Sequence, residues 1–229
     1  EFVNTHPLAA EGRADGKPFV EISLGRTELS LQQLDQLTST LGAKRGIIVA
    51  GPMPEADKVG EASLALAAAT GYPILADPLS GARFGSSGGA QKVAAYDLFL
   101  RNKTICSALT PDLVIRVGAT PTSAALQGWL QSHNGVRHIV VDAGRRWKDY
   151  GATATDYLRT DPEKTLRVLA EYAEQVVDEA WAFSWRAASR AARAVLEQDE
   201  GRLHEGSVLA EGPFEAVQAD ARVREVYLG

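Results

Sequence analysis

Four short apolar runs, each followed by a segment long enough for a helix, constrain the fold more than any other feature. The runs are GIIVAG (46–51), PILADP (73–78), DLVIRVG (112–118) and RHIVVDA (137–143). Strands that are apolar on both faces are typical of a parallel sheet covered by helices on both sides. Strands that alternate with helical segments indicate βαβ units. We therefore predict an α/β fold with a doubly wound parallel sheet.

The segments between and around these runs carry helix signals. Ser30 precedes a segment with leucines at helical spacing, and Gly42 ends it. Asp161 followed by Pro162 is a strong helix start, because Asp caps well and Pro fits the first turn. We predict helices from Ser30 to Gly42, over 56–70, 92–102 and 121–132, from Asp161, and over 179–200; a short strand is predicted within 154–161, and an edge strand at 19–24.

These elements divide the chain into four parts. Residues 1–27 contain three glycines and two prolines with little periodicity, which predicts an extended linker from a preceding domain. Residues 28–178 form the α/β domain, and 179–205 a helix with a further linker. Residues 206–229 form a C-terminal tail of uncertain origin.

Composition excludes several functions. The formal net charge is −5, which disfavours nucleic acid and anionic membranes as partners because both need a basic face. Cys106 is the one cysteine and the four histidines are scattered, so neither a disulfide framework nor a metal site is expected. No signal peptide or membrane-spanning run is evident. We expect a cytoplasmic protein.

In a doubly wound sheet, ligands bind beyond the carboxyl ends of the strands. The loop after residues 46–51 lacks the G-x-G-x-x-G pattern of a dinucleotide site and carries two prolines instead. The glycine- and serine-rich loop at 80–89 is either an anion site with Arg83 as counter-charge, or a surface loop. Arg145 and Arg146 can grip a carboxylate or phosphate, or else lie on a solvated loop or a subunit contact.

Three motifs give the chain a family resemblance: ADPLSGAR (76–83), YDLFLR (96–101) and RVGATPTS (116–123). In this order they resemble the central domain of the 2-succinyl-5-enolpyruvyl-6-hydroxy-3-cyclohexene-1-carboxylate synthases. These are thiamin-diphosphate enzymes of menaquinone biosynthesis. The resemblance covers residues 45 to about 185 and implies the middle-domain type of doubly wound sheet.

The resemblance implies that two other domains hold thiamin diphosphate and Mg²⁺ (or Mn²⁺), and that this chain alone binds neither and is inactive. Its implied partners are those cofactor-binding domains, within a homodimer or tetramer. The full enzyme decarboxylates 2-oxoglutarate and adds the succinyl carbanion to isochorismate. In this family a Lys after P-T-S reaches the substrate carboxylate, whereas Ser123, itself a candidate substrate contact, is followed here by Ala124. Either this copy is non-catalytic, or Arg116 or Arg83 substitutes for that Lys.

The tail has a resemblance of its own. Residues 206–229 are similar to the C-terminal end of ABC-transporter ATPases, although the chain has no G-x-x-x-x-G-K-[ST] loop. Two alternatives to a synthase domain therefore stay open. One is a stand-alone module that binds a small anion at 80–89, and the other is a remnant fused to an ABC ATPase tail.

Overall fold

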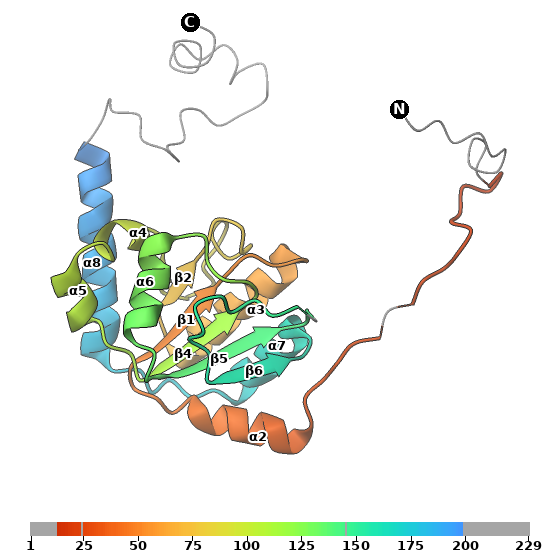
Figure 1. Cartoon of the computed structure of the whole chain (residues 1–229), viewed down its shortest axis with the longest axis horizontal. Coiled ribbons are helices and arrows are strands. Elements are labelled where there is room, and N and C mark those ends of the chain that lie inside the picture. Colours follow the sequence, from red (N-terminus) through yellow and green to blue (C-terminus); the bar gives the residue numbers. More distant parts are fainter. Residues whose placement is uncertain (1–12, 24, 145, 199–229) are drawn as a thin grey trace, which may run out of the picture. The chain divides into compact units, whose positions relative to one another are not determined.

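A computed structural model describes residues 13–23, 25–144 and 146–198. Its centre is a six-stranded sheet in the order β3-β2-β1-β4-β5-β6, with every pair parallel (Figure 1). This order confirms the predicted doubly wound α/β fold. The strands are β1 Gly46–Ala50, β2 Ile74–Ala76, β3 Lys92–Val93, β4 Leu113–Val117, β5 Arg137–Asp142 and β6 Asp156–Arg159.

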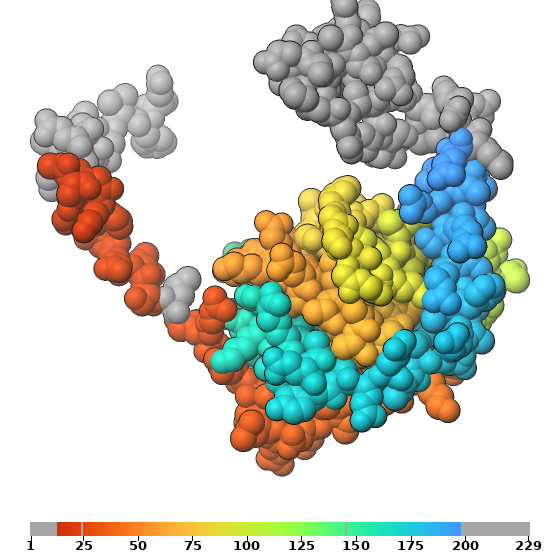
Figure 2. Space-filling model, turned by 180° about the vertical axis from the view of Figure 1, so that it is seen from behind, coloured from red at the N-terminus to blue at the C-terminus, as the bar shows by residue number. Residues whose placement is uncertain are grey.

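Helices cover both faces of the sheet. α2, α3 and α7 cover one face, and Figure 2 shows them side by side on that face of the molecule. α4, α5, α6 and the first turns of α8 lie on the other face (Figure 1). The helices are α2 Leu31–Thr40, α3 Ala56–Thr70, α4 Tyr96–Phe99, α5 Lys103–Ala108, α6 Ala124–Ser132, α7 Pro162–Tyr172 and α8 Glu179–Gln198.

The central strands β1 and β4 are buried along their whole length, as their two-sided apolar pattern predicts. On the face of α4 to α6, the core includes an aromatic cluster. The Trp185 ring lies 5.8 Å from Phe99 and 5.5 Å from Trp129, measured between ring centroids. Trp181 donates its indole N–H to the Gly46 carbonyl at 2.9 Å. The start of α8 is therefore part of the sheet domain's core.

Three predicted elements differ from the structure in extent or type. Lys92 and Val93 are not helical, because they pair with β2 as a short parallel strand, and α4 begins only at Tyr96. The predicted helix at 121–132 begins three residues later, because the Ser123 side chain caps it by accepting from the Leu126 N–H. The edge strand does not form over the described residues 19–23.

The chain divides into two units, Glu1–Ser189 and Arg190–Gly229. The first contains the sheet, and every site discussed below lies in it. The predicted tail at 206–229 lies outside the described residues. Within the described part of the chain, no helix combines the length and the apolar character needed to span a bilayer.

Candidate functional site

The strand order reverses between β1 and β4, so a doubly wound sheet would be expected to open a ligand crevice there. In this chain the crevice is filled by backbone. Gly51 N–H donates to the Val117 carbonyl and Ala119 N–H to the Pro52 carbonyl, both at 2.9 Å. A Cβ on Gly51 would lie 2.1 Å from the Ala119 oxygen. The two loops therefore close directly on each other.

The residues at this crevice do not fit a diphosphate group. The β1 loop contains two prolines, which lack N–H groups, and the N-cap of α3 is the acidic residue Glu55, whose charge opposes a bound anion. In the described part of the chain, no three or more His, Cys, Asp or Glu side chains are grouped to hold a metal ion. These residues provide no cradle for thiamin diphosphate with its metal.

Asp77 of the first motif joins the loop after β2 to the loop after β4, next to the carboxyl end of β1. Asp77 follows β2 and is 1 % exposed. One carboxylate oxygen accepts from the Leu79 N–H at 3.0 Å, and the other accepts from both the N–H and the hydroxyl of Thr122 at 2.8 Å. A buried carboxylate needs such donors to be tolerated. The aspartate of ADPLSGAR and the threonine of PTS therefore form one structural contact.

The cations within and beside the glycine-rich loop at 80–89 bind backbone carbonyls. Arg83 donates to the Ala76 and Ala94 carbonyls at 3.0 and 2.6 Å. Lys92 donates to the Gly85 carbonyl at 3.0 Å. Both cations thus bind backbone carbonyl oxygens around the loop. An anion would have to displace these carbonyls before it could bind either cation. This geometry favours a structural role for Arg83.

Ser123 links the second motif to the third. Its hydroxyl donates to Asp97, and Arg101 donates to the other oxygen of that carboxylate at 2.7 Å. Burial raises the pKa of Asp97, but these hydrogen bonds outweigh it, and the net pKa is below its ordinary value. A small cavity of about 190 Å³ opens here, lined by Pro78, Arg83, Ala94, Tyr96, Asp97, Thr122 and Ser123.

Arg116 lies within β4 and is 1 % exposed. It pairs with Asp149 at 3.0 Å, and it also donates to the Lys148 carbonyl and the Thr120 hydroxyl. Burial lowers the pKa of the Arg116 guanidinium, and the charge of Asp149 opposes that shift. Arg116 thus binds two residues of the loop after β5 and holds that loop in place.

His138 in β5 is buried near this ion pair, and its Nε2 atom has no hydrogen-bond partner. Burial, and then the positive charge of Arg116, lower the pKa of His138 to about 4. His138 is therefore neutral at physiological pH. Sequence reasoning passed over it because a lone histidine in an apolar run carries no motif.

Of the two arginines predicted in the loop after β5, Arg146 is exposed, and Arg145 lies outside the described residues. Neighbouring Lys148 pairs with Asp142 at 2.9 Å, and Tyr157 donates to the same carboxylate at 3.2 Å. Asp142 thus binds its own loop. The structure brings Arg83 and Ser123 to one cavity, whereas Arg116 lies in a separate buried network.

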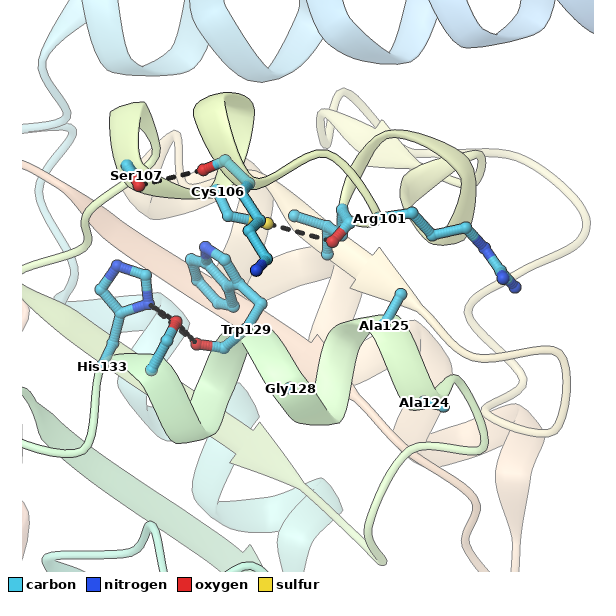
Figure 3. A pocket seen from close by; sticks show the side chains of 11 residues that line it. Arg101, Cys106, Ser107, Ala124, Ala125, Gly128, Trp129 and His133 are labelled. Carbon is cyan, nitrogen blue, oxygen red and sulfur yellow. Dashed lines mark hydrogen bonds between the residues drawn. The ribbon is translucent and has the colours of Figure 1, made fainter.

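A larger groove of about 530 Å³ lies between α5 and α6 (Figure 3). Ala124, Ala125 and Gly128 form its α6 side, and their small size leaves the groove open. Arg101 and Lys103 contribute its cations. Ala124, where the resemblance leads one to expect Lys, is exposed at the first position of α6.

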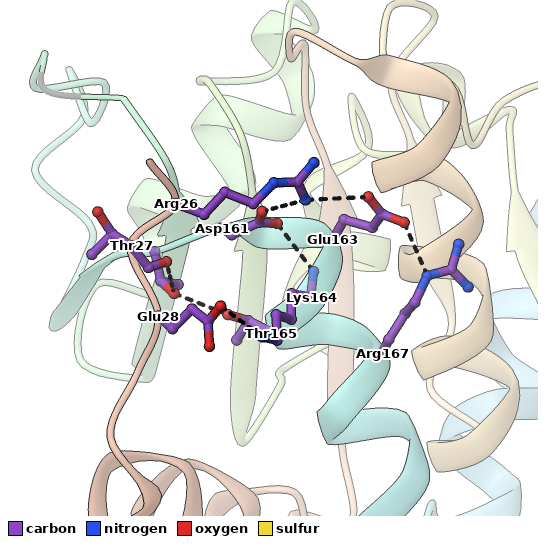
Figure 4. A network of polar contacts seen from close by, with 9 residues as sticks. Arg26, Thr27, Glu28, Asp161, Glu163, Lys164, Thr165 and Arg167 are labelled. Carbon is purple, nitrogen blue, oxygen red and sulfur yellow. Dashed lines mark hydrogen bonds and ion pairs between the residues drawn. The ribbon is translucent and has the colours of Figure 1, made fainter. Parts of the chain in front are cut away.

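The linker is fixed where it reaches the domain (Figure 4). Asp161 N–H and the Thr160 hydroxyl donate to the Thr27 carbonyl at 2.8 and 3.1 Å. Arg26 pairs with Asp161 at 2.8 Å, and Lys164 with Glu28 at 2.6 Å. Because Thr160 and Asp161 follow β6, the linker meets the domain at the carboxyl edge of the sheet.

Comparison with known proteins decides the family. A family model described as the middle domain of thiamine pyrophosphate enzymes matches residues 12–214. The chain belongs to this family of middle domains. The synthase of Halobacterium salinarum is 42 % identical over 176 residues, and that of Geobacillus kaustophilus is 39 % identical over 193 residues. Both are 2-succinyl-5-enolpyruvyl-6-hydroxy-3-cyclohexene-1-carboxylate synthases, which confirms the resemblance carried by the three motifs.

The matches cover 76 % and 82 % of this middle-domain chain, but only 29 % and 33 % of the two relatives. The chain thus spans about a third of the length of these synthases. A solved structure attributed to a thiamin diphosphate-dependent enzyme of Mycobacterium smegmatis is 21 % identical, with a TM-score of 0.45, over 71 % of this chain and 31 % of that one. A second family model, of branched-chain amino acid ATP-binding cassette transporters, matches residues 207–229.

Proposed function

We propose that this middle domain is part of a synthase that decarboxylates 2-oxoglutarate and adds the succinyl carbanion to isochorismate in menaquinone biosynthesis. In this proposal, thiamin diphosphate and Mg²⁺ are held by other domains of the same enzyme, and the chain alone is inactive. The assembled enzyme is a cytoplasmic homodimer or tetramer. Thiamin diphosphate supplies the carbanion chemistry when bound. The residues described here hold the scaffold in shape.

One observation carries this proposal: the residues of the three motifs bind one another. Asp77 of the first motif binds Thr122 of the third, and Asp97 of the second binds Ser123 of the third. The sequence pattern shared with the synthases is thus accounted for by the internal structure of the domain. The closed crevice between β1 and β4 supports placing the cofactor outside this chain.

A chimera tests the proposal. The matched 193-residue segment of the G. kaustophilus synthase is replaced by the corresponding segment of this chain. We expect the chimera to bind thiamin diphosphate, and the 229-residue chain alone to give no heat with thiamin diphosphate and Mg²⁺ in calorimetric titration. Tight binding by the chain alone would refute the assignment of the cofactor to other domains.

Ala124 sharpens the test. The resemblance implies a Lys at this exposed helix position, so Ala124→Lys in the chimera should raise isochorismate-dependent consumption of 2-oxoglutarate. Ser132→Lys, two turns further along the same groove, is the matched control for added charge. A folded, cofactor-binding chimera that consumes no 2-oxoglutarate even with Ala124→Lys would sink the proposed reaction.

A further inference from the structure

The loop after β5 exposes two large aromatic side chains. Trp147 is 54 % exposed and Tyr150 is 81 % exposed, with Arg146 exposed beside them. We refer to residues 146–150 as the aromatic loop. Exposed aromatic surface of this size is unfavourable in water unless something covers it. Trp, Tyr and Arg are also the residue types that most often dominate binding energy at protein interfaces.

The aromatic loop is held from beneath. Arg116 and the Thr120 hydroxyl both donate to the Lys148 carbonyl, at 3.0 and 2.8 Å. Asp149 accepts from Arg116 on one oxygen and from the Ala154 N–H on the other. Buried hydrogen-bonded charges of this kind fix the backbone of the loop in one position.

The Trp147 side chain is fixed as well. Its indole N–H donates to the Asp149 carbonyl at 2.9 Å. Its ring stacks on Tyr157, with centroids 5.1 Å apart and planes inclined by 24°. The domain therefore orders an aromatic side chain on its surface and leaves about half of it open. A side chain that is ordered in advance loses less entropy on binding.

The aromatic loop lies on the edge of the sheet where the linker enters. β5 and β6 pair with Asp142 opposite Arg159, so the loop after Asp142 and the residues after Arg159 leave the same edge. Those latter residues, Thr160 and Asp161, bind the linker (Figure 4). Polypeptide that precedes Arg26 therefore approaches the domain on the side of the aromatic loop.

We propose that the aromatic loop is the docking surface for the cofactor-binding domain that precedes this chain in the synthase. This inference rests on the proposed function. About two thirds of each relative's length has no counterpart here. In the proposed synthase, the domain before the linker reaches this side of the middle domain and can cover the aromatic loop. We expect the docked face of the preceding domain to be apolar with carboxylates at its rim, because Arg146 and Arg159 are exposed on this side.

Hydroxyl-radical labelling read by mass spectrometry tests this docking. The 229-residue chain and the G. kaustophilus chimera are labelled side by side. Trp147 and Tyr150 should react about fivefold more slowly in the chimera, because interface cores lose nearly all contact with water. Tyr172, 68 % exposed at the end of α7, is the internal control and should react equally in both. Equal labelling of Trp147 and Tyr150 in both proteins would overturn the docking surface.

A variant separates docking from a role within the domain. Tyr150→Ser should lower the Tm of the chimera by several degrees and leave that of the isolated chain within about 1 °C, because an 81 % exposed ring stabilises little by itself. Tyr172→Ser should change neither protein. An equal loss in the chimera and the isolated chain would overturn the proposal.

The two proposals fail in different ways. If the chimera is active, and Trp147 and Tyr150 are labelled in it as fast as in the isolated chain, only the docking surface is refuted. A chimera that does not assemble refutes the proposed function, and labelling of the isolated chain then decides the surface. Trp147 and Tyr150 already protected there in dilute solution would mean that a second copy or the chain itself covers them, and would overturn the docking.

Discussion

The carboxyl edge of the sheet is closed in two different ways. Between β1 and β4, backbone meets backbone, and Gly51 and Gly118 leave no room for a side chain. After β5, the loop is held by charged side chains, chiefly Arg116 with Asp149 and Lys148 with Asp142. The first closure depends on shape, and the second depends on buried charge.

This difference predicts different sensitivities. A closure by shape is indifferent to pH but fails when one methyl group is added. A closure by charge tolerates changes of side-chain size but fails when one partner is removed, since the other stays buried and unpaired.

The largest effect is expected from Asp149→Ala. The substitution leaves Arg116 buried without its partner, and unpairing a buried ion typically costs about 3–5 kcal/mol of unfolding free energy. The Ala154 N–H loses its acceptor as well. Urea unfolding followed by circular dichroism measures the loss.

Asp112→Ala is the matched control. Asp112 pairs with Arg45 at 2.6 Å, a shorter distance than in the buried pair, but both side chains are well exposed. Exposed pairs contribute little because water screens them. We expect a much smaller loss than for Asp149→Ala. Equal losses would mean that burial does not set the strength of the closure after β5.

Closure by shape is tested by Gly51→Ala. The new Cβ would lie 2.1 Å from the Ala119 oxygen, which is backbone and cannot rotate away. We expect a loss of about 2–4 kcal/mol in unfolding free energy. Gly128→Ala is the control, because nothing lies within 4 Å of its Cβ position in α6. It should stabilise the protein by about 0.5–1 kcal/mol through helix propensity. If Gly51→Ala left the unfolding free energy unchanged, the crevice between β1 and β4 would be able to open.

The pH dependence of stability tests the charged side. His138 has an ordinary pKa of 6.5 when unfolded and about 4 when folded. The unfolded state therefore takes up the proton first as pH falls. The part of the unfolding free energy that is linked to His138 is fully present above pH 6.5. It is lost as the pH falls from 6.5 to 4, with a slope of about 1.4 kcal/mol per pH unit. His138→Gln should flatten this part of the curve in urea unfolding at a series of pH values. An unchanged slope would assign the loss to other groups.

The elements that sequence predicts well are those with one dominant local signal. β1 and β4 are runs of apolar residues, and α7 has Asp161 as cap and Pro162 at its first position. Lys92 and Val93 were misassigned because their state depends on pairing with Ile74 and Leu75, which are distant in sequence. A helix over 92–102 satisfies the local pattern, and only tertiary contact overrides it.

The candidate site was less predictable. Arg83, Arg116 and Ser123 were singled out as contacts for a ligand, since their charge or hydroxyl suits an anion. Their partners in the structure are carbonyls and carboxylates of the domain itself. Those partners come from other loops, so no spacing in the sequence reveals them. Asp149, 33 residues after Arg116, carries no motif.

The smallest effect of the four substitutions is expected at Ser123, which joins the third motif to the second through Asp97. Ser123→Ala removes the N-cap of α6 and one donor to Asp97. We expect a loss of about 1–2 kcal/mol in unfolding free energy. Ser30→Ala, at the N-cap of α2, removes a comparable cap without a carboxylate partner, and should cost about 0.5–1 kcal/mol.

The Ser123 variant also has a signature in pH. Burial raises the pKa of Asp97 while the Ser123 hydroxyl lowers it, so the variant should have a higher Asp97 pKa in an NMR titration. Because the wild-type pKa is depressed on folding, Asp97 stabilises the protein above its ordinary pKa and loses that effect in acid. Ser123→Ala should shrink this acid-dependent part, whereas Ser30→Ala should not. An unchanged Asp97 pKa would mean that Ser123 acts only as a helix cap, and that the second and third motifs are joined by packing rather than by charge.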